Sequence, residues 1–198
     1  MAIGILAFGS LRNNPGRELD PLIIRRDPSE TPFCVEFARS SQKRGGAPTL
    51  VPVEAGLRLP AEILVLSEGV DKPTVVNMLY RREIQQVGTT KRYPSPPRTV
   101  VIKTCRPDAV SQDIHEVLFA SNERNIPVED LTPQHLAHLA IDSVHLADPG
   151  MDGIAYLIDA KHCSARTSLS QDYERAILAR VGVESLEQAL AALMTKRS

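Results

Sequence analysis

The sequence has little cysteine, no excess of charge of either sign and no long hydrophobic run. Its three cysteines, Cys34, Cys105 and Cys163, form no CxxC pair and are odd in number, which favours a reduced compartment over a disulfide-stabilised secreted protein. The 23 lysines and arginines nearly balance the 24 aspartates and glutamates, and the net charge is −1. This balance argues against a nucleic-acid-binding protein, because such proteins need a strong basic excess or a basic face.

The apolar run at the N-terminus, residues 2–8, has no basic residue before it and is too short for a signal peptide or a membrane span. We therefore expect a cytoplasmic protein without a membrane segment. The 198 residues, 42% of them hydrophobic, are enough to bury a core without a disulfide, a structural metal or a partner chain. The composition predicts one domain over residues 1–198 and leaves open whether it forms a homodimer.

Six short apolar segments bounded by turn residues are typical of strands in an antiparallel or mixed sheet. The first, 3–7, predicts a buried strand that ends at the turn-forming pair Gly9-Ser10. The other predicted strands cover residues 33–38, 49–52, 61–66, 99–104 and 154–158.

Apolar residues at helical spacing predict five helices. The first begins near Asp71 and Pro73 and continues to Glu83. The others are expected over 110–122, after Thr132-Pro133, from Ser170 to Gly182, and after Ser185, whose spacing to Gln188 is that of a capping box.

The segment Phe8-Gly9-Ser10-Leu11, at the end of the first predicted strand, is the first candidate site. A glycine at this point allows a positive φ and a close approach to a ligand, so that backbone N–H groups converge on an anion or a developing oxyanion. The sequence has neither the lysine of a P-loop nor a Gly-x-Ser-x-Gly elbow. The alternative is an ordinary tight turn.

Glu83 is the second candidate, because helical spacing places it on the same stripe as Val76, Leu79 and Tyr80. Arg81 and Arg82 are expected to point elsewhere. Burial against the core and the negative end of the helix dipole both favour the neutral form of an acid, which suits a general acid or base. The alternative is a solvated glutamate that pairs with Arg82 or Arg44.

Cations and histidines provide two further candidates. Six cations could flank a cleft and bind substrate carboxylates, or could be solvated surface: Arg12, Arg39, Lys43, Arg44, Lys91 and Arg92. His135 and His138 lie three apart on a predicted helix, but no carboxylate or cysteine completes a ligand pattern. We therefore expect no metal site.

These motifs, in this order, resemble the gamma-glutamylcyclotransferase-like family. Phe8-Gly9-Ser10-Leu11 resembles the Tyr-Gly-Ser-(Asn)-Leu signature of that family, and segments 44–51 and 61–66 resemble the loop and strands that follow it. The helix ending Leu79-Tyr80-Arg81-Arg82-Glu83 resembles the helix that carries the acid/base glutamate. The likeness covers about the first half of the chain, with a weaker likeness in the last predicted strand, 154–158, and in 167–173.

The resemblance implies an α+β fold, a small mixed or antiparallel β-barrel surrounded by helices. Its core would be residues 1–105 plus a last strand near 154–158, with helical additions at 108–145 and 170–195. It also implies an enzyme without metal or cofactor that converts a γ-glutamyl amine or peptide into 5-oxoproline and the free amine. Glu83 would be the catalytic acid/base, and the small acidic substrate would be bound by Phe8, Gly9, Ser10, Leu11, Arg44 and Tyr93.

Two departures from the family pattern keep other functions open. Phe8 replaces the usual tyrosine, and Ile84 follows Glu83 where the family often has glycine. These departures favour a non-catalytic small-molecule-binding or regulatory protein on the same fold. An enzyme acting on another amide and an interaction module built on the C-terminal helices are the remaining alternatives.

Overall fold

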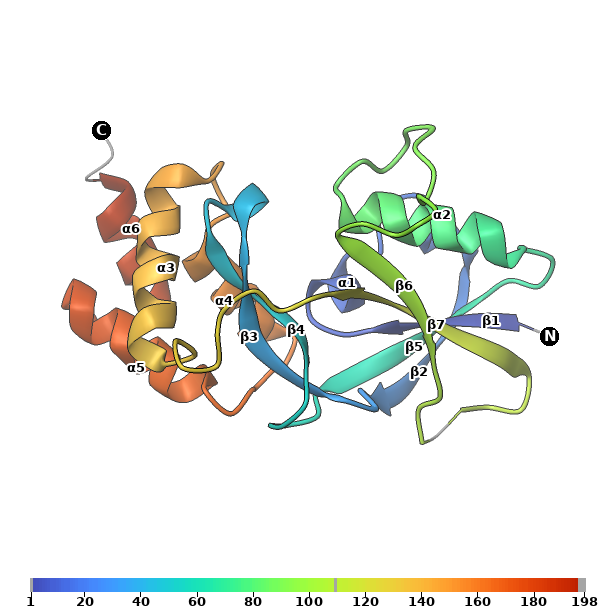
Figure 1. The fold of residues 1–198 in the computed structure, drawn as a ribbon, viewed down its shortest axis with the longest axis horizontal. Helices are drawn as coiled ribbons and strands as arrows, with labels where there is room; N and C mark the ends of the chain where they lie inside the picture. Colours follow the sequence, from blue (N-terminus) through green and yellow to red (C-terminus); the bar gives the residue numbers. More distant parts are fainter. Residues whose placement is uncertain (1, 109, 196–198) are drawn as a thin grey trace. The chain divides into compact units, whose positions relative to one another are not determined.

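The computed structural model describes residues 2–108 and 110–195, which form two compact units. Unit 1 comprises Met1–Pro32 and Arg58–Glu123, and unit 2 comprises Phe33–Leu57 and Arg124–Ser198 (Figure 1). Helices and mostly antiparallel strands occur together, which confirms the α+β class. The single domain over residues 1–198 stays a prediction.

Unit 1 is built on a five-stranded sheet with the strand order β2-β5-β1-β7-β6. Strand β1 pairs antiparallel with β5 and parallel with β7, and all of its residues are buried, as expected for a central strand. The strands are β1 (Ala2–Ala7), β2 (Ile23–Glu30), β5 (Pro60–Leu66), β6 (Val100–Cys105) and β7 (Ile114–Asn122).

Helix α2 (Lys72–Glu83) packs on this sheet against β6 and β7 (Figure 1). The Asp71 side chain accepts a hydrogen bond from the Thr74 N–H at 2.7 Å and so caps the first turn, close to the predicted start. Val75 and Leu79, one turn apart, are fully buried in a cluster with alternate residues of β1, among them Ile5. The short helices α1 (Ser10–Asn13) and η1 (Asp20–Leu22) follow β1.

In the part of unit 2 that the structure describes, a two-stranded sheet is combined with four α-helices and the short 3-10 helix η2. The ring of Phe37, on β3, meets the rings of Tyr173 and Tyr156 edge to face, with centroids 5.3 and 6.3 Å apart. Tyr173 is completely buried, so these rings lie in the core of the unit. The elements are β3 (Cys34–Ser41), η2 (Gln42–Arg44), β4 (Ala47–Val53), α3 (Pro133–Leu146), α4 (Gly153–His162), α5 (Ser170–Val181) and α6 (Leu186–Thr195).

Two predicted elements are wrong in type. Residues 154–158 lie in α4, because the Asp152 carboxylate accepts from the N–H groups of Ile154 and Ala155 at 3.0 and 2.9 Å and begins a helix there. Residues 114–122 of the predicted helix 110–122 form β7. The middle of this strand is buried on both faces, so its apolar residues do not alternate. Their spacing therefore fits a helix as well as a strand.

Strand β2 was not expected from the sequence. It is an edge strand that carries Arg25, Arg26, Asp27 and Pro28, and its largely exposed residues show no apolar period. The other five predicted strands are confirmed, as are the helices after Pro133, Ser170 and Ser185.

The β-barrel that the resemblance implied is not closed within the described residues. Strands β2 and β6 remain edges of the five-stranded sheet, and β3 and β4 form a separate sheet in unit 2. A barrel has no edge strands, so this arrangement corrects the expectation. In the same part of the chain, no helix combines the length and the apolar character needed to cross a membrane.

We predict that Leu79→Ala destabilises unit 1 by about 2–5 kcal/mol, because it leaves a cavity under α2 at a fully buried position. Hydrogen exchange of β1 and β5 peptides, measured at increasing urea concentration, gives the free energy of unfolding of this unit. Ile24→Ala truncates a side chain that is 62% exposed and should change that free energy by less than about 0.5 kcal/mol. Equal effects of the two substitutions would contradict the described core.

Glu36 is a buried carboxylate in the interior of unit 2. Its oxygens accept from the N–H of Phe37 at 2.9 Å and from the N–H of Leu169, at the start of α5, at 3.2 Å. Burial raises the pKa of Glu36, and hydrogen bonds from Thr167 and the backbone act in the opposite direction.

Because the native pKa of Glu36 is raised, unit 2 binds this proton more tightly than the unfolded chain does. The stabilisation is complete below the ordinary pKa of glutamate and is lost as the pH rises through the higher native value. We predict that Glu36→Gln flattens this part of the pH dependence of the stability of unit 2, measured by urea unfolding. Glu54→Gln, at an exposed position of the same unit, should retain the wild-type slope. An unchanged slope in Glu36→Gln would refute the assignment.

Candidate functional site

The turn after β1 and the C-terminal end of α2 meet at the side chain of Arg82, within unit 1. Its Nη1 donates to Glu83 Oε1 at 2.7 Å, and its Nη2 donates to Ser10 Oγ at 3.1 Å. Nε and Nη2 also donate to the carbonyl oxygen of Asn14 at 3.1 and 3.0 Å. We call Ser10, Asn14, Arg82 and Glu83 the Arg82 cluster. One guanidinium thus joins two predicted motifs that lie 72 residues apart.

Gly9 turns the chain from β1 into α1. Its φ of 56° and ψ of −138° belong to a region that residues with a Cβ rarely adopt, which explains the glycine. Ser10 and Leu11 then begin α1, and the first N–H groups of a helix have no acceptor within the helix. The structure therefore forms the predicted turn and places its serine hydroxyl in the Arg82 cluster.

Glu83 is the last residue of α2, and its side chain is only 17% exposed. Within the described residues, Arg82 is the single partner of its carboxylate, and this contact involves Oε1. The Arg82 side chain, expected to point away from the apolar stripe, extends to acceptors on both the turn and the helix end, among them Glu83. The pairing with Arg82 proposed as the alternative does occur, but the acid is largely sheltered rather than solvated.

Phe8 and Tyr93 both belong to unit 1. Phe8 lies between β1 and Gly9 and is partly buried. The Tyr93 hydroxyl accepts from the N–H of Ile102 on β6 at 3.0 Å, and its ring packs against Tyr80 at 5.4 Å between centroids. The Tyr93 side chain thus has a structural role in attaching its segment to the sheet. Substrate binding by these two residues stays a prediction.

Arg44, the remaining predicted binding residue, belongs to unit 2. Its Nη1 donates to the carbonyl of Met151 at 3.2 Å, and the guanidinium lies 4.7 Å from the centroid of the Tyr156 ring. This cation–π contact and the hydrogen bond attach η2 to the loop before α4 and to α4 itself. Its role in substrate binding is untested.

The other cations are divided between the two units. In unit 1, Arg12 pairs with Glu62 at 3.1 Å, whereas Lys91 and Arg92 are exposed. Arg39 and Lys43 belong to unit 2. Across the described part of the chain, no three His, Cys, Asp or Glu side chains are placed to hold a metal ion.

An open cavity of about 880 Å³ lies elsewhere in unit 1, where β6 and β7 are joined. Cys105 and His115 contribute to its wall, but neither Glu83 nor the Gly9 turn does. Burial raises the pKa of the Cys105 thiol to about 11, so that it is protonated at neutral pH and is a poor nucleophile. Because this cavity contains neither of the two predicted motifs, we place the candidate site at the Arg82 cluster.

The sequence predicted neither the Arg81–Glu18 pair nor the hydrogen bonds from Arg82 to Ser10 and Asn14. Arginines in the last turn of a helix are favourable next to its negative end, and this is the signal that could have indicated them. Their partners, Ser10, Asn14 and Glu18, come from a distant segment and carry no pattern of their own.

In comparisons with known proteins, no family model matches the chain and no curated protein matches it.

We predict that Arg82→Gln loosens the turn after β1, because the Ser10 hydroxyl, the Asn14 carbonyl and the Glu83 carboxylate all lose a charged donor. Amide hydrogen exchange over residues 10–14 should become about tenfold faster or more. Arg92→Gln removes an exposed arginine of the same unit and should leave this exchange unchanged. If Arg82→Gln also leaves it unchanged, Arg82 does not hold the turn.

Proposed function

We propose that the protein is a γ-glutamyl cyclotransferase-like enzyme, which converts a γ-glutamyl amine or peptide into 5-oxoproline and the free amine without a metal. The observation that carries the proposal is that Glu83 and Ser10 bind the same guanidinium. The acid and the donor-rich turn that the family resemblance pairs are therefore neighbours within unit 1.

The proposed reaction needs few protein groups, because the substrate supplies its own nucleophile. The α-amino nitrogen attacks the γ-carbonyl carbon, a new C–N bond closes the five-membered ring, and the original amide C–N bond breaks. One proton leaves the attacking nitrogen and one is delivered to the departing amine. The attack is intramolecular, and holding the substrate in a folded conformation keeps the nitrogen and the γ-carbonyl carbon in the geometry for attack.

Glu83 would move this proton. Arg82 occupies its Oε1, so Oε2 is the oxygen that would take the proton from the α-amino group and return it to the leaving amine. The sheltered position of the carboxylate, 17% exposed, limits competition from bulk water. Arg82 also fixes the direction of the carboxylate relative to the turn.

The backbone at Gly9, Ser10 and Leu11 would bind the negative charge of the reaction. The Gly9 conformation starts a helical turn whose first N–H groups have no acceptor within the helix. Such donors suit either the substrate α-carboxylate or the oxyanion of the tetrahedral intermediate. A preorganised donor of this kind can lower the barrier by about 3 kcal/mol.

The same proposal includes the finer fold assignment, a γ-glutamylcyclotransferase-like core, of which unit 1 contains the first strand, the glycine turn and the helix that ends in the acid. The order of elements supports it: a buried strand, a glycine turn, further strands and then a helix that ends in the acid. The open sheet of unit 1 is a departure from the barrel of that fold.

A non-catalytic small-molecule-binding protein is the second candidate, and one observation favours it. Arg82 donates to Ser10, Asn14 and Glu83 at once, so Glu83 Oε1 is held in an ion pair rather than left free for proton transfer. A protein that only senses an acidic metabolite would need no proton transfer, and Phe8 would then not replace a needed hydroxyl.

We predict that the wild-type protein releases 5-oxoproline from at least one member of a panel of γ-glutamyl peptides and amines, detected by mass spectrometry. Glu83→Gln should lower kcat at least about 100-fold, because it removes the proton acceptor and keeps the size of the side chain. Glu30→Gln changes an exposed acid of the same unit and should retain full activity.

Two outcomes would overturn this assignment. Full activity in Glu83→Gln removes Glu83 from the reaction. Absence of product from every compound, together with saturable binding of one of them in calorimetry, leaves the binding protein as the function.

A further inference from the structure

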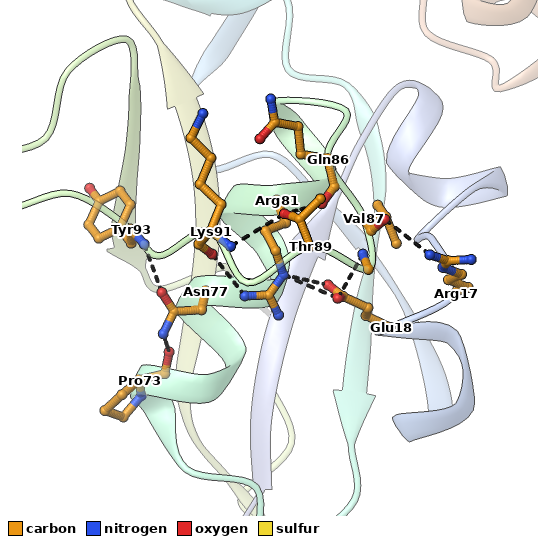
Figure 2. Close-up of polar contacts among 11 residues, drawn as sticks. Arg17, Glu18, Pro73, Asn77, Arg81, Gln86, Val87, Thr89, Lys91 and Tyr93 are labelled. Atoms are coloured by element: carbon orange, nitrogen blue, oxygen red, sulfur yellow. Dashed lines mark hydrogen bonds and ion pairs between the residues drawn. The ribbon is translucent and has the colours of Figure 1, made fainter.

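A second polar network, drawn in Figure 2, surrounds Arg81, the residue that precedes Arg82 in the sequence. Arg81 Nε donates to both carboxylate oxygens of Glu18, at 2.9 and 3.1 Å, and its Nη1 donates to the carbonyl of Lys91 at 3.0 Å. Glu18 Oε1 also accepts from the N–H of Gly88 at 2.9 Å. We call Glu18, Arg81, Gly88 and Lys91 the Arg81 network.

This network joins three segments of unit 1. Glu18 lies between α1 and η1, Arg81 is in the last turn of α2, and the other two residues belong to the segment that leaves Glu83. The two charged side chains are 13% and 18% exposed. A pair sheltered to this degree is screened less by solvent than a surface pair.

Further contacts fold the segment 86–91 onto the helix end. The Gln86 N–H donates to the Arg81 carbonyl at 2.8 Å, and the Thr89 hydroxyl donates to the Gln86 carbonyl at 2.9 Å. Figure 2 shows the segment passing over the Arg81 guanidinium before it reaches Tyr93, whose N–H donates to Asn77 Oδ1 at 2.7 Å. The segment is thus fastened at both ends.

The Arg81 network restrains the chain on both sides of Glu83. Helix ends fray because their last carbonyl groups have no partner within the helix, and Glu83 is the last residue of α2. Arg81 is bound two residues before it and Gly88 five residues after it. The residues just before Glu83 and the segment just after it therefore both bind the same carboxylate, that of Glu18.

We propose that Glu18 and Arg81 are positioning residues, which fasten the segment 86–91 and thereby hold Glu83 in its reactive position. The consequence for catalysis rests on the function proposed above, whereas the fastening itself does not. Glu18 would not touch the substrate. It acts by restricting the helix end that carries the acid.

Trypsin tests the fastening without any assay of activity, because Lys91 and Arg92 lie within or next to the segment. Cleavage of a peptide bond needs local opening of the chain around it. In Glu18→Gln, native-state cleavage after these two residues should become about tenfold faster or more. Cleavage after Arg98, outside the network, should keep its wild-type rate and serves as the internal control.

A double-mutant cycle and a matched control separate the network from general loss of stability. Glu18→Gln and Arg81→Gln both break the Glu18–Arg81 pair, so in the double variant the increase in cleavage rate should be smaller than the product of the two single increases. Glu116→Gln breaks the Lys72–Glu116 pair at the opposite end of α2 and should leave cleavage after Lys91 unchanged.

If Glu18→Gln fails to fold, judged by circular dichroism, Arg81→Lys replaces it. A lysine cannot bind both Glu18 and the Lys91 carbonyl, because it lacks the fork geometry of arginine.

Steady-state kinetics of Glu18→Gln distinguish a residue that positions Glu83 from one that binds the substrate. Glu18→Gln should lower kcat about tenfold or more, because a misplaced acid slows proton transfer, and it should change KM less than about twofold. Unchanged cleavage after Lys91 overturns the fastening. Faster cleavage with unchanged kcat overturns the positioning role. Absence of wild-type activity refutes the proposed function and the positioning role together, while the cleavage result still decides whether the network fastens the segment.

Discussion

The Arg82 guanidinium places one positive charge among three acceptors from two distant segments: the Ser10 hydroxyl, the Asn14 carbonyl and the Glu83 carboxylate. A guanidinium can serve all of them because its donors lie in one plane with a fixed geometry. Without it, the partly buried Glu83 carboxylate would lose its charged partner, and leaving a sheltered charge unpaired costs free energy. The turn after β1 and the end of α2 therefore hold each other in place. The candidate site therefore depends on this contact between the turn and the helix end.

The sheet of unit 1 makes this contact possible. Strand β1 is central and fully buried, so the turn that follows it has a fixed origin. Helix α2 is held by Val75 and Leu79 in the same core cluster. Arg81 and Arg82 then extend from its last turn to residues 10–18, where positive side chains also favour the negative end of the helix dipole. Stability and the placement of the acid thus depend on the same few contacts.

Much of this arrangement could be predicted from local sequence. Gly9 after an apolar strand predicted the turn, and Asp71, Pro73 and the apolar spacing to Glu83 predicted α2. Local pattern failed where tertiary context decides the outcome. Strand β7, buried on both faces, has a helix-like distribution of apolar residues, and the exposed edge strand β2 has no apolar period. The Arg82–Glu83 pair was weighed as an alternative, but the partners in residues 10–18 could not be predicted, because long polar side chains choose among acceptors that only the folded chain brings together.

Nuclear magnetic resonance of the Glu83→Gln protein with a γ-glutamyl dipeptide tests the central claim most directly, because the substrate would bind there without being consumed. The account predicts saturable shifts of the backbone amide signals of Gly9, Ser10 and Leu11, accompanied by the side-chain signal of Arg82. Shifts confined to other parts of the chain would contradict it. So would the absence of any shift with every compound of the substrate panel at millimolar concentration.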